Sequence, residues 1–335
     1  MPALPVLKSK DFASDQDVRW CPGCGDYAIL NAVQRVVAKT GASRENTVFI
    51  SGIGCSSRFP YYMSTYGFHS IHGRAPGFVM GLKVANPQLD VWMVTGDGDG
   101  LSIGGNHLMH MLRRNVNVNA MLFNNRIYGL TKGQYSPTSE QGKRTKSSPM
   151  GSLDFPLDPV RLALAAGGTF VARSTDKDRG LVDMLTRAAG HKGTSFCEIY
   201  QNCNIFNDGA FEPMTGKDTR EDNVLYLKHG KPMVFGKDIK KGLRMVGMRP
   251  EVVVLGENGI TEDDLIFHDE TNSTLAMMLA GLHHPEFPEP LGVFYVEDRP
   301  VYEEQVARQV DQATEKRGAG KLDDLFNDGD TYVLK

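Results

Sequence analysis

The chain has 335 residues, of which 41% are hydrophobic and 23% are charged. This composition is ordinary for a globular protein, and it excludes a chain that is disordered or of low complexity throughout. The 37 basic and 40 acidic residues give a net charge of −3, so the charge does not favour a general nucleic-acid binder. The 36 glycines exceed the usual share and indicate tight turns and close backbone approach to ligands.

The sequence carries no signature of a secreted or membrane protein. The N-terminal stretch MPALPVLKSKDFASDQD lacks the apolar core of a signal peptide. The longest apolar stretch, residues 162–172, is far shorter than the ~20 residues that span a bilayer. We therefore expect a cytoplasmic protein without membrane contact. Thiols stay reduced in that compartment, so its five cysteines are expected to be metal ligands or bystanders rather than disulfides.

Strands and helices alternate over the first two hundred residues. The predicted strands cover residues 47–54, 90–99, 117–125, 168–173 and 194–203, and the predicted helices cover residues 25–41, 77–86, 103–114, 158–166 and 176–190. This alternation predicts an α/β fold in which helices cover both faces of a parallel sheet. Ligands of such sheets bind outside the carboxyl ends of the strands. A long polar loop, about residues 128–153, is expected to be functional or mobile.

The main α/β domain is predicted to occupy residues 1–210. Residues 211–335 are less regular, and we expect them to form an extension that packs on the core and on a partner subunit. This extension holds a basic stretch, residues 228–244, followed by an acidic one, residues 262–270.

Four of the five cysteines are positioned to meet. Cys21 and Cys24 are separated by two residues, so both sulfurs can reach one metal centre, and the first amide groups of the following helix stabilise thiolates. Cys55 and Cys203 lie at the ends of predicted strands and could join them at one edge of the sheet. Isolated third and fourth cysteines fit an iron–sulfur cluster better than structural zinc, which normally shows two close pairs. Cys197 lies in mid-strand and is interpreted as a small buried hydrophobe.

A second motif consists of GDG at residues 96–98 and NN at residues 124–125, separated by 25 residues. Asp97 offers a carboxylate to Mg²⁺, Asn125 offers an amide oxygen, and the carbonyl of Ile127 can add a third ligand. The two glycines let the backbone approach a diphosphate, and the predicted helix 103–114 begins nearby. Either half alone is commonly a turn, but both halves at this spacing predict a magnesium–diphosphate site.

This pattern resembles the thiamine-diphosphate-binding motif. Combined with RWCPGCGD, GIGCSSR, HGRAPG, GLTKGQYSPTS and the late QNC, it resembles the beta subunits of 2-oxoacid:ferredoxin oxidoreductases. The similarity is greatest to the two-subunit 2-oxoglutarate type, and it covers about residues 15–305. The resemblance implies the thiamine-diphosphate-binding fold, with thiamine diphosphate, Mg²⁺ and one 4Fe–4S cluster as cofactors.

The resemblance also assigns residues to these cofactors. The cluster ligands fall on four cysteines: Cys21, Cys24, Cys55 and Cys203. The magnesium ligands fall on Asp97, Asn125 and Ile127. The contacts to thiamine diphosphate fall on Ile53, Gly54, Cys55, Ser56, His72, Gly98, Asp99, Gly129 and Leu130. His107, inside the motif, is taken as a helix residue.

Two basic residues, Arg58 and Lys132, lie close to these motifs in the sequence. The ordinary interpretation of either is a solvated surface charge. The resemblance implies that they contact the 2-oxoacid, and two cations suit the two carboxylates of 2-oxoglutarate. A broad-specificity enzyme, or one that acts on pyruvate, is the nearest alternative.

The implied reaction is the oxidative decarboxylation of 2-oxoglutarate with coenzyme A to succinyl-CoA and CO₂. Electrons pass through the cluster to ferredoxin, and strongly reduced ferredoxin would drive the reverse reaction, which fixes CO₂. The resemblance implies an alpha subunit that supplies the glutamate facing the cofactor's pyrimidine, so this chain is predicted to be inactive alone and to assemble as (αβ)₂. The basic stretch 228–244 is either a solvated face or a docking patch for an acidic ferredoxin.

Two other classes of protein stay open. A non-redox thiamine enzyme would hold zinc at the cysteines and would contain no iron. A non-catalytic, cysteine-rich scaffold would bind neither thiamine diphosphate nor Mg²⁺.

Overall fold

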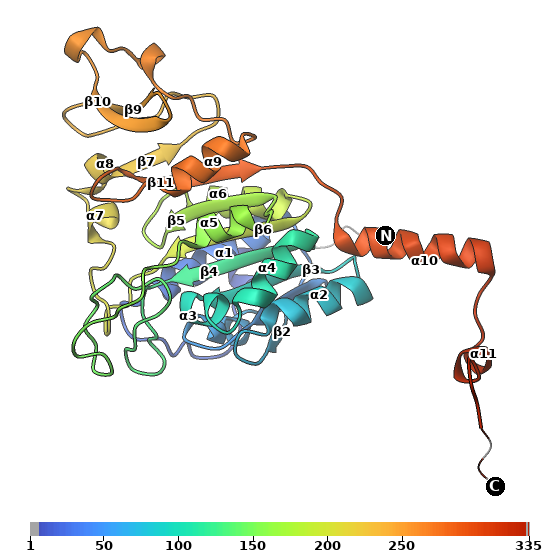
Figure 1. Ribbon diagram of the computed structural model, residues 1–335. Helices are drawn as coiled ribbons and strands as arrows, with labels where there is room; N and C mark the ends of the chain where they lie inside the picture. Colours follow the sequence, from blue (N-terminus) through green and yellow to red (C-terminus); the bar gives the residue numbers. More distant parts are fainter. Residues whose placement is uncertain (1–6, 333, 335) are drawn as a thin grey trace.

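The computed structural model describes residues 7–332 and residue 334, and its centre is an eight-stranded sheet of order β2-β1-β3-β4-β6-β5-β11-β7 (Figure 1). The first six strands in the chain are parallel to one another in this sheet, which confirms the predicted α/β class. They are β1 (Thr47–Ser51), β2 (Tyr66–His69), β3 (Asp90–Gly96), β4 (Val118–Asn124), β5 (Phe170–Thr175) and β6 (Thr194–Tyr200).

Residues after 210 contribute to the same sheet. β11 (Glu289–Val296) pairs with β5 in antiparallel orientation, and β7 (Val224–Leu227) runs parallel to β11. The sequence predicted a parallel sheet. The antiparallel strand β11 makes the observed sheet mixed. β8 (Val234–Phe235), β9 (Lys241–Val246) and β10 (Arg249–Val254) form a separate three-stranded sheet at the top of Figure 1. The division into residues 1–210 and 211–335 stays a prediction, and β7 and β11 tie the second part to the first.

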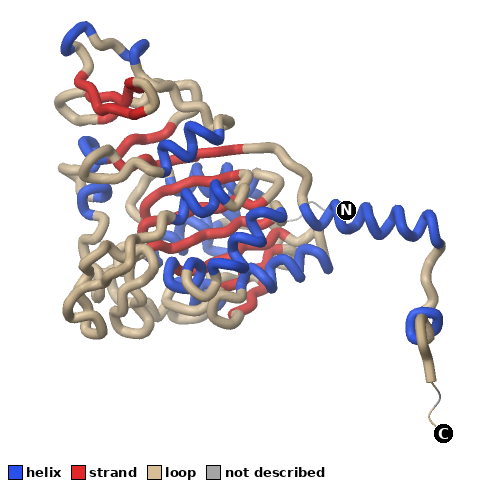
Figure 2. The backbone as a smooth tube through the Cα atoms, viewed as in Figure 1, coloured by secondary structure: helices blue, strands red, loops and turns tan. Residues whose placement is uncertain are grey.

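Helices cover both faces of the large sheet, as predicted (Figure 2). One face packs against α1 (Asp26–Thr40) and α6 (Leu181–Gly190). The other face packs against α2 (Ala75–Ala85), α4 (Gly105–Arg114), α5 (Pro159–Ala165) and α9 (Ser273–Ala280). α1 ends at the predicted glycine, because Gly41 adopts the left-handed conformation (φ 74°) that closes a helix.

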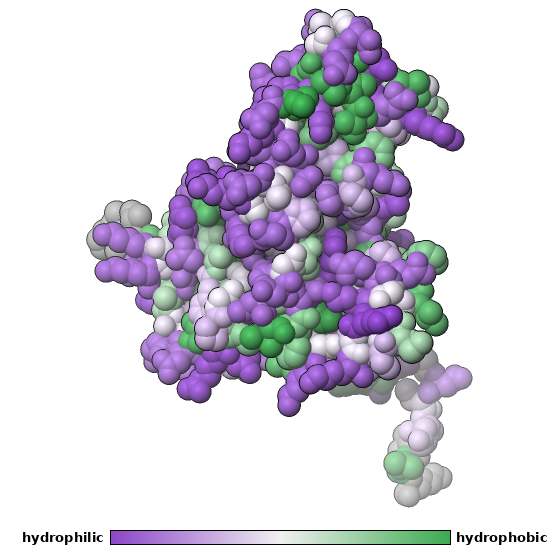
Figure 3. Space-filling model, turned by 90° about the vertical axis from the view of Figure 1, so that its left-hand side faces the viewer, coloured by the Kyte–Doolittle hydropathy of each residue, from purple (hydrophilic) through white to green (hydrophobic). Residues whose placement is uncertain are grey.

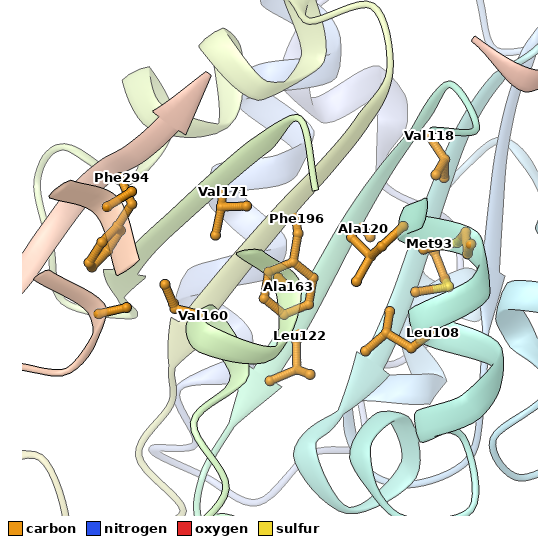
Figure 4. Packing of buried hydrophobic residues seen from close by; sticks show 14 of the residues in the cluster. Met93, Leu108, Val118, Ala120, Leu122, Val160, Ala163, Val171, Phe196 and Phe294 are labelled. Atoms are coloured by element: carbon orange, nitrogen blue, oxygen red, sulfur yellow. The ribbon is translucent and has the colours of Figure 1, made fainter. Parts of the chain in front are cut away.

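Alternate residues of each central strand belong to the two opposite cores. In β3, Trp92 and Val94 pack toward α1 and α6, whereas Val91 and Met93 pack toward α2 and α4. Figure 4 shows the second of these cores, where side chains of the central strands meet Leu108 of α4. Because both faces of the sheet are buried, these strands are nearly continuous apolar runs, and this is why the sequence predicted them well.

Several strand ends differ from the prediction, and two of these differences concern candidate site residues. Residues 97–101, of which 97–99 were expected to continue a strand, form the short helix α3 (Asp97–Leu101), and the next helix starts at Gly105. The predicted strand 194–203 stops at Tyr200, so Cys203 lies in the following loop, where it forms a bridge with Asn207. In both cases the chain leaves the sheet as soon as the apolar run ends.

The other elements are short, apart from α10. They are η1 (Ser9–Phe12), η2 (Ser56–Tyr62), α7 (Glu212–Thr215), α8 (Arg220–Asn223), η3 (Glu257–Gly259), η4 (Glu262–Asp264), α10 (Tyr302–Arg317) and α11 (Leu322–Phe326). α10 leaves the body of the molecule and carries α11 away from it (Figure 1). Between β4 and α5 the described chain forms no regular helix or strand, which agrees with the long loop predicted there.

Two sequence predictions concern the chain's relation to a membrane. Among the described residues, no helix is both long enough and apolar enough to cross a bilayer. Residues 1–6 of the N-terminal stretch that was predicted to lack a signal peptide lie outside the described part of the chain.

Candidate functional site

A cavity of about 490 Å³ opens where β1, β3 and β4 end. Its lining includes all the residues that the resemblance assigned to thiamine diphosphate and to magnesium. These are Ile53, Gly54, Cys55, Ser56, His72, Asp97, Gly98, Asp99, Asn125, Ile127, Gly129 and Leu130. They come together because parallel strands place their carboxyl ends along one edge of the sheet.

The carboxylate of Asp97 is buried and held by two hydroxyl groups. Its Oδ2 accepts hydrogen bonds from Ser136 Oγ at 2.5 Å and from Thr138 Oγ1 at 2.6 Å. Burial raises the pKa of Asp97 to about 6, and the two hydroxyls oppose this rise. A cation bound beside the carboxylate would favour its ionised form further. The two hydroxyls thus fix the orientation of the Asp97 carboxylate.

The two asparagines of the NN motif have different surroundings. Asn125 lines the cavity, where its Oδ1 accepts from the amide of Ile127 at 3.1 Å and its Nδ2 donates to Gln201 Oε1 at 3.0 Å. Asn124 is buried; its Nδ2 donates to Glu198 Oε1 at 2.7 Å, and its Oδ1 accepts from Thr138 Oγ1 at 2.9 Å. Successive residues of a strand point to opposite sides, so one asparagine can serve the cavity while the other secures the loop that holds Asp97.

Asp99 orients the ring of His72. Its Oδ1 lies 2.5 Å from His72 Nδ1 and accepts from the amide of Gly73 at 2.7 Å, while its Oδ2 accepts from Thr95 Oγ1 at 2.7 Å. A Cβ at Gly52 would lie only 1.7 Å from the same carboxylate, so this position needs glycine. Both His72 and Asp99 border the cavity, and their predicted contact with a cofactor stays a prediction.

The structure shows why residue 98 is a glycine, and the sequence did not reveal this reason. A Cβ at this position would lie 2.2 Å from the ring of Tyr128, whose hydroxyl donates to the carbonyl of Gly98 at 2.9 Å. The glycine therefore lets Tyr128 close one wall of the cavity. Its predicted role in backbone approach to a diphosphate is compatible with this packing and stays untested.

A second, smaller cavity of about 210 Å³ adjoins the first, and Cys21, Cys24, Cys55 and Cys203 all line it. The sulfurs of Cys55 and Cys203 each lie 3.6 Å from the point that a Cβ on Gly129 would occupy. Among the described residues, no group of three or more Cys, His, Asp or Glu side chains is already arranged to hold a metal ion. The four cysteines share one cavity, as the sequence suggested, and their ligation of a cluster stays a prediction.

The surroundings of these thiols are short of polar partners. Burial raises the pKa of the Cys55 thiol to about 11, and the negative charges of Asp26 and Cys203 add to this rise. Burial likewise raises the pKa of Cys24, whose sulfur accepts a hydrogen bond from Gln201 Nε2 at 3.2 Å. Without a metal, Cys24 and Cys55 are therefore protonated at neutral pH. A bound metal ion favours thiolates strongly, so this donor set suits a soft metal centre.

Arg58 and Lys132 line the cysteine cavity and are absent from the lining of the larger one. Lys132 has a left-handed backbone conformation (φ 77°), and its amide donates to the carbonyl of Gly129 at 3.0 Å. The two cavities share Cys55, Asn125, Gly129, Leu130 and Gln201. Both cations therefore stand on the cysteine side of the junction, and their predicted contact with a 2-oxoacid stays a prediction.

Sequence reasoning assigned no role to several residues that the structure brings to the site. Phe123, Tyr128, Thr131, Gln134 and Gln201 also line the larger cavity, and Ser136 and Thr138 hold Asp97. The signal for the last two was available, since the motif GLTKGQYSPTS places hydroxyls at alternating positions.

Two other predictions about single residues are confirmed. Cys197 is buried in β6 with 1% of its surface exposed, and burial raises its pKa to about 12. His107 lies in α4, where it contacts the guanidinium of Arg74.

Residues 52–199 match the family described as "Thiamine pyrophosphate enzyme, C-terminal TPP binding domain". This match and the fold thus define a thiamine pyrophosphate-binding domain over these residues. The chain is 52% identical over 333 residues to the 2-oxoglutarate oxidoreductase subunit KorB of Mycobacterium tuberculosis, and the match covers 98% of this chain and 88% of that protein. The chain belongs to the family of 2-oxoacid:ferredoxin oxidoreductase beta subunits, a family of oxidoreductases, and this Mycobacterium relative is of the 2-oxoglutarate type.

Two further relatives agree. The 2-oxoacid:ferredoxin oxidoreductase 1, subunit beta, of Aeropyrum pernix is 46% identical over 191 residues, covering 56% of this chain and 60% of that protein. The solved structure of the "2-oxoglutarate:ferredoxin oxidoreductase from Magnetococcus marinus with 2-oxoglutarate, coenzyme A and succinyl-CoA bound" superposes with a TM-score of 0.77 at 32% identity, covering 97% of each chain.

Proposed function

We propose that this chain is the cofactor-binding beta subunit of a 2-oxoglutarate:ferredoxin oxidoreductase. The enzyme oxidises 2-oxoglutarate and coenzyme A to succinyl-CoA and CO₂, and two ferredoxins take up one electron each. The observation that carries the proposal is the junction of the two cavities, since Cys55 and Gly129 belong to both. Such a junction supports the proposal, because groups bound in the two cavities would be neighbours and a thiamine cofactor could pass electrons to a cluster.

The larger cavity suits thiamine diphosphate and Mg²⁺. Asp97, Asn125 and the carbonyl of Ile127 would hold the metal, which prefers oxygen ligands and commonly bridges to phosphate. Thiamine diphosphate, when bound, supplies the nucleophilic carbon and the electron sink for decarboxylation. His72, fixed by Asp99, would provide a ring N–H or a lone pair to the cofactor from the wall of the cavity.

The smaller cavity suits a 4Fe–4S cluster with Cys21, Cys24, Cys55 and Cys203 as ligands. Four thiolates from separate loops are the usual ligand set of such a cluster. The hydrogen bond from Gln201 to the sulfur of Cys24 would tune its reduction potential, because donors to sulfur stabilise the reduced state.

The substrate is recognised, in this proposal, by Arg58 and Lys132. One cation binds each carboxylate of 2-oxoglutarate, and the arginine can form two parallel hydrogen bonds. A broad-specificity or pyruvate-oxidising enzyme is the alternative, favoured by the more general name of the Aeropyrum relative.

The chain acts with partners. Its relatives are named as subunits, which supports an alpha subunit that supplies the pyrimidine-side glutamate, an (αβ)₂ heterotetramer and no activity for the isolated chain. Ferredoxin and coenzyme A complete the set, and the enzyme works in the cytoplasm. Under strongly reducing conditions the same steps run backward and fix CO₂.

The test is an anaerobic purification of the chain together with the protein that binds it. We expect about four iron and four sulfide per chain, thiamine diphosphate, and reduction of ferredoxin that requires both 2-oxoglutarate and coenzyme A. Faster reduction with pyruvate would replace the substrate assignment. Zinc without iron in the purified protein would indicate a non-redox thiamine enzyme. The absence of both thiamine diphosphate and Mg²⁺ would indicate a non-catalytic scaffold.

A further inference from the structure

One buried side chain borders both cavities. Gln201 directly follows β6 and lines the larger cavity as well as the smaller one, with 2% of its surface exposed. The central strands end on the left of Figure 1, and Figure 3 faces that side of the molecule, so Gln201 lies beneath the surface shown there. Its hydrogen bonds are therefore shielded from water, where each of them is electrostatically stronger than in solvent.

Both ends of the Gln201 side chain are occupied. Its Oε1 accepts a hydrogen bond from Asn125 Nδ2 at 3.0 Å. Its Nε2 donates to the sulfur of Cys24 at 3.2 Å and to the carbonyl of Asn202 at 2.6 Å. An amide nitrogen carries two hydrogens, so these two contacts use both of them. Gln201 thus joins a residue of the larger cavity to a sulfur of the smaller one.

The direction of this chain of hydrogen bonds is fixed at its start. The backbone amide of Ile127 can only donate, and it donates to Asn125 Oδ1 at 3.1 Å. The Nδ2 of Asn125 must then face Gln201, which answers with its oxygen. The nitrogen of Gln201 is therefore the group that faces Cys24, because turning the Gln201 amide over would bring two N–H groups together at Asn125.

We propose that Gln201 couples the larger cavity to the reduction potential of a cluster in the smaller one. The inference rests on the proposed function, in which Asn125 Oδ1 binds Mg²⁺ and Cys24 binds the cluster. A cation on Asn125 Oδ1 withdraws electrons from that amide, so its N–H becomes a stronger donor to Gln201. Gln201 is polarised in turn and becomes a stronger donor to the sulfur, because hydrogen bonds in a chain strengthen one another.

The consequence is an order of events. Donors to a cluster sulfur stabilise the reduced state. The cluster therefore accepts an electron more readily when the larger cavity holds Mg²⁺ and thiamine diphosphate than when it is empty. Gln201 is a positioning residue in this scheme, since it acts through Asn125 and Cys24 rather than on the substrate.

The experiment uses the complete complex with its partner subunit. The midpoint potential of the cluster is measured by electron paramagnetic resonance during a reductive titration. Each protein is titrated after removal of Mg²⁺ and thiamine diphosphate, and again after both are restored. Gln201→Met keeps the length of the side chain and removes its amide. Gln134→Met is the matched control, because Gln134 lines the larger cavity but bonds Thr131 instead.

Two results are expected. Restoring the metal and thiamine diphosphate should raise the midpoint potential equally in the unmodified complex and in Gln134→Met, by at least about twofold in the equilibrium constant for reduction. Gln201→Met should lower that constant about tenfold before restoration, or about 59 mV for one electron, because a hydrogen bond to sulfur is lost. Its response to restoration should be clearly smaller, since only the direct field of the bound groups is left.

Equal responses in Gln201→Met and the unmodified complex would overturn the coupling, even where ferredoxin is still reduced with 2-oxoglutarate. If Gln201→Met assembles no cluster, Gln201→Glu takes its place. Glutamate keeps an oxygen toward Asn125 and puts a second carboxylate oxygen in place of the donor to Cys24, so the same loss of response is expected. Absence of iron from the unmodified complex would overturn the proposed function together with the coupling.

Discussion

The two adjoining cavities are built in opposite ways. In the larger one the functional side chains are already held by hydrogen bonds: Asp97 by two hydroxyls, Asp99 by three donors, Asn125 by its own turn. In the smaller one the four thiols have few partners, and burial keeps at least two of them protonated. The larger cavity is preorganised by the protein alone, whereas under the proposed function the smaller one would gain its final arrangement only with a metal centre.

The largest expected effect comes from removing one thiol of the smaller cavity. Cys203→Ser should abolish the cluster and with it all ferredoxin reduction, because a 4Fe–4S cluster needs four ligands. Thiamine diphosphate should still bind, since the larger cavity does not depend on the metal. Iron content, the electron paramagnetic resonance signal of the reduced protein and bound cofactor are the measurements. Cys197→Ala is the control; full iron content in Cys203→Ser would show that this thiol is not a ligand.

The second effect concerns the ion network behind the larger cavity. Arg173 is fully buried, and its guanidinium donates to Glu198 at 2.6 Å and to Glu289 at 2.7 Å. Arg173→Met leaves Glu198 without its cation and leaves Glu289 with His283 alone, which should lower the free energy of unfolding by ~3–5 kcal/mol. Urea unfolding measures this loss. The double variant R173M/E198Q should recover part of it, and equal stability of both variants would show that the charge of Glu198 is not the cause.

A smaller effect is expected at the hydroxyls that hold Asp97. Thr138→Val removes one hydrogen bond to Asp97 and one to Asn124, at a cost of about 1–3 kcal/mol. The affinity for Mg²⁺ in the presence of thiamine diphosphate should fall by roughly tenfold or more, which calorimetry can measure. Thr131 lines the same cavity without a hydrogen bond to Asp97, so Thr131→Val is the control. If both variants bind Mg²⁺ equally well, the cavity is not preorganised through Thr138.

The smallest effect is a pH dependence at His283, which bonds Asp158 at 2.9 Å and lies 3.3 Å from Glu289. Burial opposes its charge, but the two carboxylates raise the pKa of His283 from 6.5 to about 9. The attraction between protonated His283 and the two carboxylates therefore stabilises the fold fully below pH 6.5. This stabilisation is lost as the pH rises through about 9.

The matching experiment compares the unmodified chain with His283→Gln by urea unfolding at several pH values. The difference in stability should be greatest near pH 6 and vanish above pH 9, and it should be small because the imidazole is 41% exposed. A difference that does not change with pH would mean that the ring acts by packing alone.

Much of the fold follows from local sequence patterns. The central strands are nearly continuous apolar runs, and the helices between them carry apolar stripes, so their positions could be predicted within a few residues. β2, with residues Tyr66–His69 exposed or partly exposed, lacks such a run and was missed. β11 was also missed as a strand of the main sheet, because its partner β5 lies more than a hundred residues earlier and nothing local specifies that pairing.

The sequence by itself determined the family of this protein, and the types and spacing of the cysteines, of GDG and of NN are the basis of the proposed ligands. Only the tertiary structure decided how those residues share space. It placed Arg58 and Lys132 in the lining of the cysteine cavity. It packed Gly98 against the ring of Tyr128. It also brought the hydroxyls of Ser136 and Thr138 within hydrogen-bond distance of the Asp97 carboxylate. The physical reason is that ligand identity is a local property of side chains, whereas contacts across strand ends depend on where loops of different lengths return to the sheet.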